Sequence, residues 1–377
     1  MLPLVSTSVP PWWRTSTEFL YFAGLVPVIG GSLLYAAVVR PAMGACSGPS
    51  ERLMRGRAAR LLAALAPVLL VTSYLQLAGR VRRADQAHAV TSALSPAAMW
   101  RFLRTPAKPG DWLSSGTELL IQNVLFALVV ALLLTLVGRG ARRLDRIAPA
   151  VLLTAVVASS VNAIPTGPSS VEATLDSVLT QLHILGASTW VGGLVGLSAL
   201  ALSTRRHLPA EASAVWARIW QRFSVVAMSA VGTMVATGAW LAWRHVAGPG
   251  ELLTTGYGRL LLAKLIAVLA MVGAGAYNQF RLTPEIARAH AAGDPALGFT
   301  LTLRRFPAVV TTEVALGTTV LLIVPFLTGS ARAQHGDGPP PTVDTTTFGL
   351  GALLVAALIG SLYTAHRVSA TLVRNPS

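Results

Sequence analysis

Long apolar segments separated by short polar ones run along most of this 377-residue chain. A helix needs about 20 consecutive apolar residues to cross the hydrocarbon core of a bilayer. Segments of about this length are read here as nine transmembrane helices. They are residues 18–39, 60–79, 118–138, 147–165, 179–203, 222–243, 258–280, 306–328 and 346–366. The pattern therefore predicts an all-α, polytopic membrane helix bundle embedded in a lipid bilayer.

Composition agrees with this interpretation and excludes a soluble domain. Charged residues make up 12% of the chain, apolar residues make up 53%, and the mean hydropathy is +0.60. Soluble domains carry roughly 25% charged residues. We expect an N-terminal four-helix half at 1–170 and a second four-helix membrane domain at 171–330. Residues 331–377 are expected to form an external Pro/Gly-rich loop, the ninth helix and a cytoplasmic tail.

The formal net charge of +15 is distributed unevenly between alternate loops. One set of loops, together with the C-terminal tail, holds nineteen arginines and five acidic residues, whereas the other side holds eleven basic and nine acidic residues. The positive-inside rule then places the N-terminus outside and the C-terminus in the cytoplasm. The loop at 80–117 departs from the rule, because it is external by alternation and yet carries Arg80, Arg82 and Arg83. Membrane topology accounts for the basic charge, so we expect no nucleic-acid partner.

The segment QLHILGASTWVGGL, residues 181–194, places a histidine, a tryptophan and a glycine pair inside an apolar span. An ionisable side chain at membrane depth is costly and therefore points to a functional site. His183 and Trp190 are seven residues apart, which is two helical turns, so they lie on one helix face. Asp176, seven residues before His183, extends this face to the start of the span.

Three motifs in the second half of the chain resemble the CopD family of copper-resistance membrane proteins. They are His183-x6-Trp190-Val-Gly-Gly193, the run from Arg222-Phe-Ser224 through Thr237-Gly238 to Lys264, and Arg305-Phe-x6-Glu313. The resemblance implies a protein that moves or handles copper across the cytoplasmic membrane of a bacterium. It also implies a periplasmic or extracellular CopC-like copper chaperone as a partner; another membrane complex is the alternative.

A copper site within the membrane requires nitrogen and sulfur donors that lie at similar depths in the bilayer. Imidazole binds copper, and thioether sulfur favours Cu(I). His183 is expected about one turn inside the outer boundary of its helix, with Met234 nearest its level and Met271 on the next helix. We therefore expect a path for Cu(I) from an outer histidine to methionines in the middle of the membrane. His183, Met234 and Met271 are the expected metal ligands. The alternative for each methionine is ordinary packing.

Lys264 and Glu313 are ionisable residues that lie several positions inside their apolar spans. Lys264 is expected either to pair with Asp176 or Glu172 or to extend its ammonium to the membrane interface. Glu313 lies at a different depth and is interpreted as an ion or proton relay or as a structural hydrogen-bonding group. Acidic residues at the outer helix ends could concentrate cations. These are Glu18, Glu118, Glu172 and Asp176.

Three functions compete. The first is a copper permease or copper-handling protein. It is expected to lack catalytic residues and an energy source of its own, since the chain has no Walker A motif. The second is a redox protein that holds haem b, for which His183 is the one convincing intramembrane histidine. The third is an assembly or accessory subunit that binds another membrane complex without transporting copper.

Overall fold

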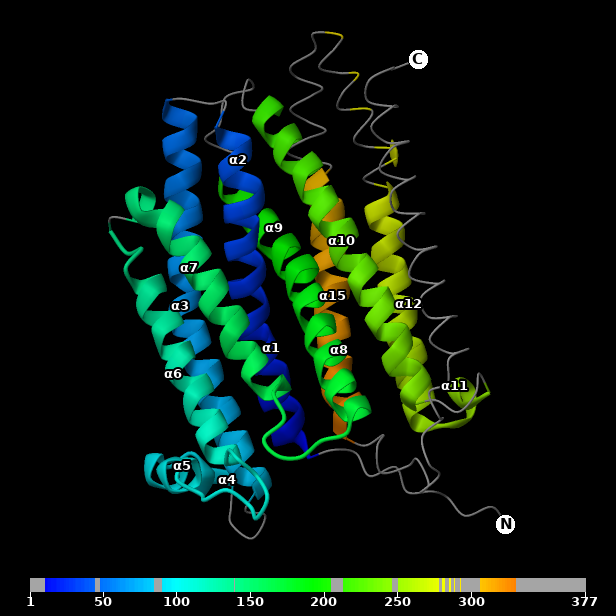
Figure 1. Ribbon diagram of the computed structural model, residues 1–377. Coiled ribbons are helices and arrows are strands. Elements are labelled where there is room, and N and C mark those ends of the chain that lie inside the picture. Colours follow the sequence, from blue (N-terminus) through cyan, green and yellow to red (C-terminus); the bar gives the residue numbers. More distant parts are fainter. Residues whose placement is uncertain are drawn as a thin grey trace.

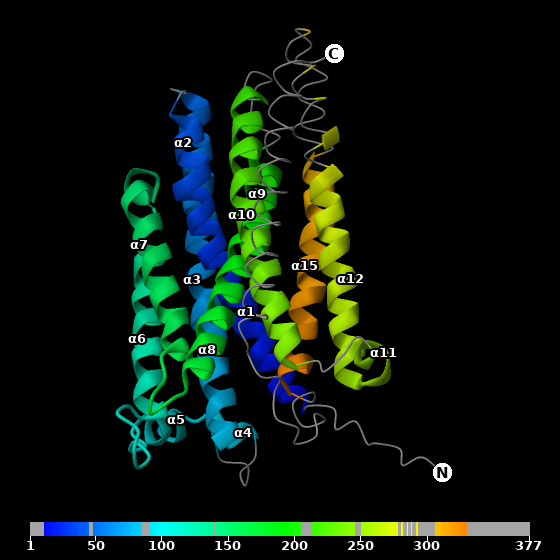
Figure 2. The same ribbon diagram turned by 45° about the vertical axis from the view of Figure 1, so that its right-hand side comes forward.

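Eight long helical segments form the part of the chain that the computed structural model describes. This part comprises residues 11–44, 48–84, 90–138, 140–204, 213–245, 250–277 and 306–329, with isolated positions between 280 and 292. It is helical and contains no strand. The two largest helical segments of the predicted second half, α8–α9 and α10, pack beside each other (Figures 1 and 2).

Two of the eight segments each contain a π-helical turn. The first runs through α1 (Trp12–Leu33), η1 (Leu34–Val39) and α2 (Arg40–Met43). The other runs through α8 (Val171–Ala187), η3 (Ser188–Gly192) and α9 (Gly193–Thr204). The other long helices are α3 (Pro49–Ala84), α6 (Ser115–Leu134), α7 (Gly140–Ser160), α10 (Ser213–His245), α12 (Gly256–Tyr277) and α15 (Phe306–Gly329). Shorter elements are α4 (Val90–Ala93), α5 (Pro96–Leu103), η2 (Val161–Ala163) and α11 (Glu251–Thr254).

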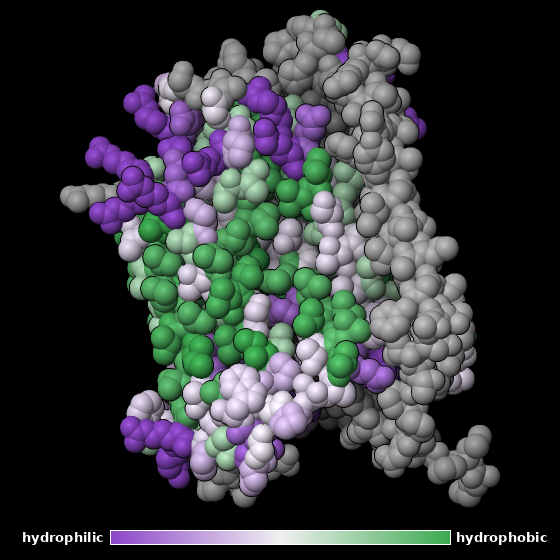
Figure 3. All heavy atoms as spheres, in the orientation of Figure 1, coloured by the Kyte–Doolittle hydropathy of each residue, from purple (hydrophilic) through white to green (hydrophobic). Residues whose placement is uncertain are grey.

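The outer surface of the bundle has the distribution of side chains that a bilayer requires. Apolar side chains form a band across the middle of the face shown in Figure 3, and hydrophilic side chains gather at its two ends. Seven helical segments of the described part are long and apolar enough to cross a membrane, and α15 contributes a further apolar helix over Thr312–Leu327. These observations describe a multi-pass membrane protein.

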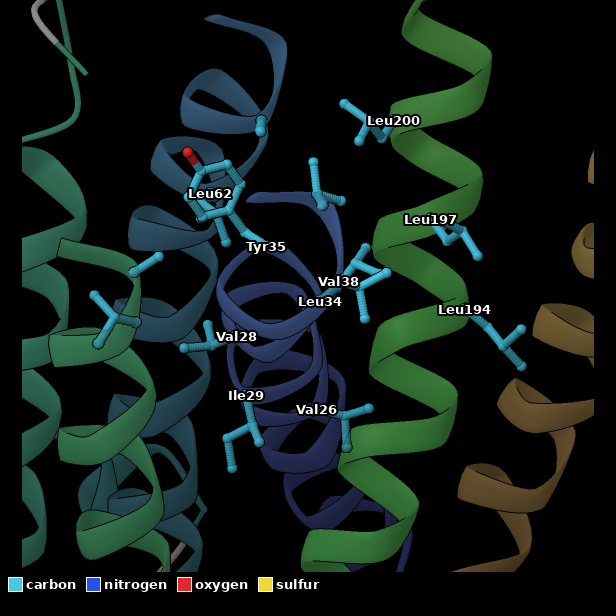
Figure 4. Packing of buried hydrophobic residues seen from close by; sticks show 14 of the residues in the cluster. Val26, Val28, Ile29, Leu34, Tyr35, Val38, Leu62, Leu194, Leu197 and Leu200 are labelled. Atoms are coloured by element: carbon cyan, nitrogen blue, oxygen red, sulfur yellow. The ribbon is translucent and has the colours of Figure 1, made fainter. Parts of the chain in front are cut away.

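Helix α1 lies at the centre of the bundle, where it contacts α3, α7, α9 and α15. The closest approach is at two glycines: a Cβ added to Gly30 would collide with backbone atoms of Gly192, Gly193 and Ser188. On the two sides of this crossing, the side chains of Val26 in α1 and Val38 in η1 face the α8–α9 helix (Figure 4). One continuous apolar cluster then joins α1 to helices from both predicted halves of the chain. The Gly-Gly pairs of the sequence therefore allow two backbones to meet.

Charged residues are paired at both ends of the bundle. At the end where α1 begins, Glu18 accepts from Arg83 at 3.0 Å and from Arg14 at 3.3 Å. At the opposite end, Asp145 accepts from Arg55 at 2.5 Å and from the Tyr35 hydroxyl at 2.7 Å. Each carboxylate ties together helices that are distant in sequence.

The helices extend beyond the predicted spans where polar ends find partners. Helix α3 runs from Pro49 to Ala84, whereas the pattern predicted 60–79, so assigning Arg80, Arg82 and Arg83 to an outer loop was wrong. Arg83 pairs with Glu18, and Arg82 lies 5.5 Å from the ring centroid of Trp13. The predicted ninth span, 346–366, lies outside the described residues. The count of nine helices, the placement of the termini and the division into domains remain predictions.

Candidate metal site between α8, α10 and α12

Helices α8 and α10 pack in an antiparallel arrangement, and their contacts bring the chemistry-bearing residues of both helices together. Asp176, near the start of α8, meets Trp240 and Arg244 near the end of α10. Further along α8, His183 meets Thr237. This succession follows from the opposite directions of the two helices, so residues later in α8 meet residues earlier in α10.

The hydroxyl of Thr237 favours the tautomer of His183 that carries its proton on Nδ1. Thr237 Oγ1 lies 2.7 Å from the carbonyl oxygen of Thr233, to which it can donate its one hydroxyl proton. The same oxygen lies 3.0 Å from His183 Nδ1 and then acts there as the acceptor. A neutral imidazole with its proton on Nδ1 leaves the lone pair of Nε2 free to bind a metal or a proton.

Two glycines allow this close packing. A Cβ at Gly238 would lie 3.1 Å from His183 Cε1 and 3.5 Å from Nδ1, so the imidazole rests directly on the backbone of α10. A Cβ at Gly186 would lie 3.0 Å from Met234 Cγ. Both positions therefore provide room for a candidate donor side chain on the neighbouring helix.

A cavity of about 240 Å³ opens beside this interface. Helices α1, α8, α10, α12 and α15 contribute to its wall. Most of the lining residues are apolar, and the polar and sulfur-bearing side chains among them are Thr180, His183, Met234, Tyr257 and Lys264. The structure thus places His183, Met234 and Lys264 around one space, although they come from three different helices.

The helix that carries His183 is longer than the sequence indicated. Helix α8 begins at Val171, eight residues before the predicted span that began at 179, so His183 is twelve residues into it, or about 18 Å along its axis. A capping bond from the Ala173 N–H to Ser170 Oγ at 3.2 Å supports this extension. The depth of His183 in the membrane, about one turn inside the outer boundary, stays a prediction.

The other predicted site residues lie outside the cavity lining. Met271 is buried, and its Cε would be 3.4 Å from a Cβ at Gly317 on α15. Glu313 is buried near Gly275, where a Cβ would be 3.7 Å from its Oε1. Trp190 is buried in the apolar core within the π-helical turn η3. The cavity therefore brings together only part of the predicted set.

Asp176 has different partners from those predicted. Its Oδ1 accepts from Trp240 Nε1 at 2.7 Å, and its Oδ2 accepts from Arg244 Nη2 at 3.1 Å. Glu172 Oε2 lies 3.8 Å from Arg244 Nη1. Of the two alternatives for Lys264, the pairing with Asp176 or Glu172 was wrong, because Arg244 pairs with both acids. Glu18 and Asp176 are likewise paired with arginines, so they do not form a free acidic mouth.

The donor set restricts the metal that could bind here. Among the described residues, no three side chains of His, Cys, Asp or Glu gather to hold a metal ion. An imidazole and a thioether form a set of two neutral donors, one of them soft. Thioether sulfur selects Cu(I), whereas hard cations prefer oxygen ligands. Cu(I) therefore fits the imidazole and thioether on the cavity wall better than a hard cation does.

Sequence reasoning missed two features that organise this region. Thr237 and Gly238 were recognised as part of a motif, but their contact with His183 depends on the register of two helices, which no periodicity encodes. The network of Asp145, Tyr35 and Arg55 was missed because Asp145 appeared to be one acid within an arginine-rich loop. The signal available in the sequence was a tyrosine, Tyr35, in the otherwise apolar stretch that forms η1.

Residues 217–327 match the family model described as Copper resistance protein D (CopD). The match covers most of α10, all of α12 and most of α15, and it includes Met234, Thr237 and Lys264. It begins after His183, so it supports the second and third motifs of the resemblance and leaves the first outside. No curated protein and no solved structure matches the chain.

Proposed function

We propose that this multi-pass membrane protein binds and conducts Cu(I) through the cavity between α8, α10 and α12. The match of residues 217–327 to the copper resistance protein D model supports the proposal. The observation that carries the proposal is that His183 and Met234 line the same cavity. His183 belongs to α8 and Met234 to α10, so copper bound by both would bridge two helices. Met271, buried further along α12, is proposed as the next donor on the path.

Orientation is part of the proposal. The end of the bundle that holds Arg40, Arg55 and the start of α7 is proposed to face the cytoplasm of a bacterial inner membrane. Arginines at the opposite end do not contradict this, since Arg83 pairs with Glu18 and Arg104 lies 4.3 Å from the ring centroid of Trp100. Copper would then enter from the outer side, and a CopC-like chaperone would deliver it.

Copper binding to the purified full chain tests the site. We expect one Cu(I) per chain at this cavity, with its affinity reduced at least about tenfold by His183→Ala or Met234→Leu, since each removes one of two protein donors. Met228→Leu is the matched control, because Met228 lies on the same helix and does not line the cavity. Unchanged affinity in both site variants would contradict the assignment.

Reconstitution into proteoliposomes tests conduction separately. Wild-type protein should move Cu(I) across the vesicle membrane, Met234→Leu should slow this movement, and Met228→Leu should not. Tight copper binding without movement would instead support the accessory-subunit alternative. A Soret band at one haem per chain would support the haem b alternative, in which His183 is an axial ligand.

A further inference from the structure

Lys264 introduces a positive charge into the cavity that is proposed to receive a cation. Its side chain lines the same space as His183 and Met234. None of the described residues that line the cavity is Asp or Glu. A bare copper ion would therefore meet an ammonium group and two neutral donors in a mostly apolar surrounding.

Asp176 and Glu313, two acids of the described part that could pair with Lys264, are engaged or distant. Asp176 accepts hydrogen bonds from Trp240 and Arg244. Glu313 lies beside Gly275, which is eleven residues from Lys264 and therefore about 16 Å along the axis of α12. Neither carboxylate is placed to neutralise Lys264 within the cavity.

Charge balance then decides what can occupy the space. Cu(I) held by His183 and Met234 keeps its full positive charge, and Lys264 adds a second. Two like charges in an environment of low dielectric repel each other strongly, and a buried charge without a counter-charge is costly. A small anion that binds copper on one side and the ammonium on the other removes this repulsion and completes a three-coordinate site.

We propose that Cu(I) occupies this cavity together with a small ligating anion of the halide class, which Lys264 holds by a charge-assisted hydrogen bond. The proposal rests on the proposed function, in which His183 and Met234 bind the copper. It assigns Lys264 a role as the anion-binding residue of the site. The ligand accepted by the cavity is then a neutral copper–anion pair rather than a bare cation.

The test compares the Cu(I) affinity of the purified full chain in sodium bromide and in sodium perchlorate at equal ionic strength. Bromide ligates copper, whereas perchlorate does not. In bromide, the wild type should bind Cu(I) at least about tenfold more tightly than Lys264→Gln, because the variant loses one charge-assisted hydrogen bond. In perchlorate the order should reverse, because the variant no longer repels the ion. Wild type and variant are compared within one salt, because binding of free copper by that salt's anion affects both measured affinities equally.

Two further variants and one spectrum sharpen the result. Lys264→Arg keeps the charge and should follow the wild type, and Arg259→Gln, at an exposed position of α12, should change nothing. X-ray absorption at the copper edge should show a bromide neighbour in the wild type, a readout that needs no variant.

The outcomes separate the two proposals. Copper binding without a bromide neighbour, or with the same order of affinities in both salts, overturns the anion role of Lys264 and leaves the copper site standing. Failure of the wild type to bind copper in either salt overturns the proposed function and the anion role with it.

Discussion

Replacing Gly238 by alanine should displace His183 without altering either metal donor chemically. The added Cβ would lie 3.1 Å from His183 Cε1 and 3.5 Å from Nδ1. Carbon atoms pack at about 3.5–4.0 Å, so the ring must shift by roughly 0.4 Å or more. The bond from Nδ1 to Thr237 Oγ1, now 3.0 Å, then lengthens or bends. A net hydrogen bond contributes about 0.5–1.5 kcal/mol.

This energy predicts a loss of Cu(I) affinity of about 2- to 13-fold in Gly238→Ala, if the shifted imidazole must return to its place to bind copper. Competition with a chromogenic Cu(I) chelator measures the change. Gly186→Ala should have a similar effect through Met234, whose Cγ would lie 3.0 Å from the new Cβ. Gly273→Ala is the matched control, since its Cβ would meet nothing within 4 Å.

The reasoning is refuted if Gly238→Ala folds and binds copper as tightly as the wild type. It is also refuted if Gly273→Ala loses as much affinity, because the effect would then come from glycine replacement in general. Elution as a monodisperse peak in detergent establishes folding for all three variants before affinities are compared.

Three further perturbations have defined outcomes. Thr237→Val removes the acceptor that orients His183 Nδ1, so Cu(I) affinity measured by chelator competition should fall about 5- to 100-fold through an unsatisfied N–H. Asp176→Asn removes the charge that pairs with Arg244 and should lower stability by about 1–2 kcal/mol, seen as a lower midpoint of thermal unfolding in detergent. Gly30→Ala places a Cβ against backbone and should cost about 3 kcal/mol or more, measured as a loss of monodisperse protein in size-exclusion chromatography.

Each of these has a control in the same part of the fold. Thr233→Val lies one turn before Thr237 at an exposed position and should keep copper affinity largely intact. Glu172→Gln removes the exposed acid 3.8 Å from Arg244 and should change stability by less than about 0.5 kcal/mol. Gly56→Ala should be neutral or slightly stabilising, because its Cβ would meet nothing within 4 Å. Equal effects in a variant and its control would contradict the contact in question.

Hydropathy predicted most of this fold because the bilayer imposes a length on each apolar segment. It could not predict helix ends that project beyond the apolar region. Helix α3 extends to Ala84 because Arg83 finds Glu18 on α1, a partner 65 residues away in sequence. Helix α8 likewise begins at Val171, eight residues before its predicted span. Such extensions depend on tertiary pairing, which apolar periodicity does not contain.

The candidate site was predictable in its residues and not in its geometry. His183, Met234 and Lys264 stand out in sequence as a nitrogen donor, a sulfur donor and a charge within apolar spans. Their meeting at one cavity depends on how α8, α10 and α12 pack. Met271 has the same chemistry as Met234 and packs instead against α15, near Gly317. Helical spacing could not distinguish the two methionines, because their neighbours come from other helices.

The most direct test of the central claim is X-ray absorption at the copper edge of Cu(I)-loaded protein in which every methionine is replaced by selenomethionine. Copper held by His183 and Met234 predicts one imidazole nitrogen and one selenium neighbour in the wild type. It also predicts loss of the selenium neighbour in Met234→Leu and its retention in Met228→Leu. A selenium neighbour that persists in Met234→Leu, or a spectrum with light-atom neighbours alone, would contradict the assignment of copper to this cavity.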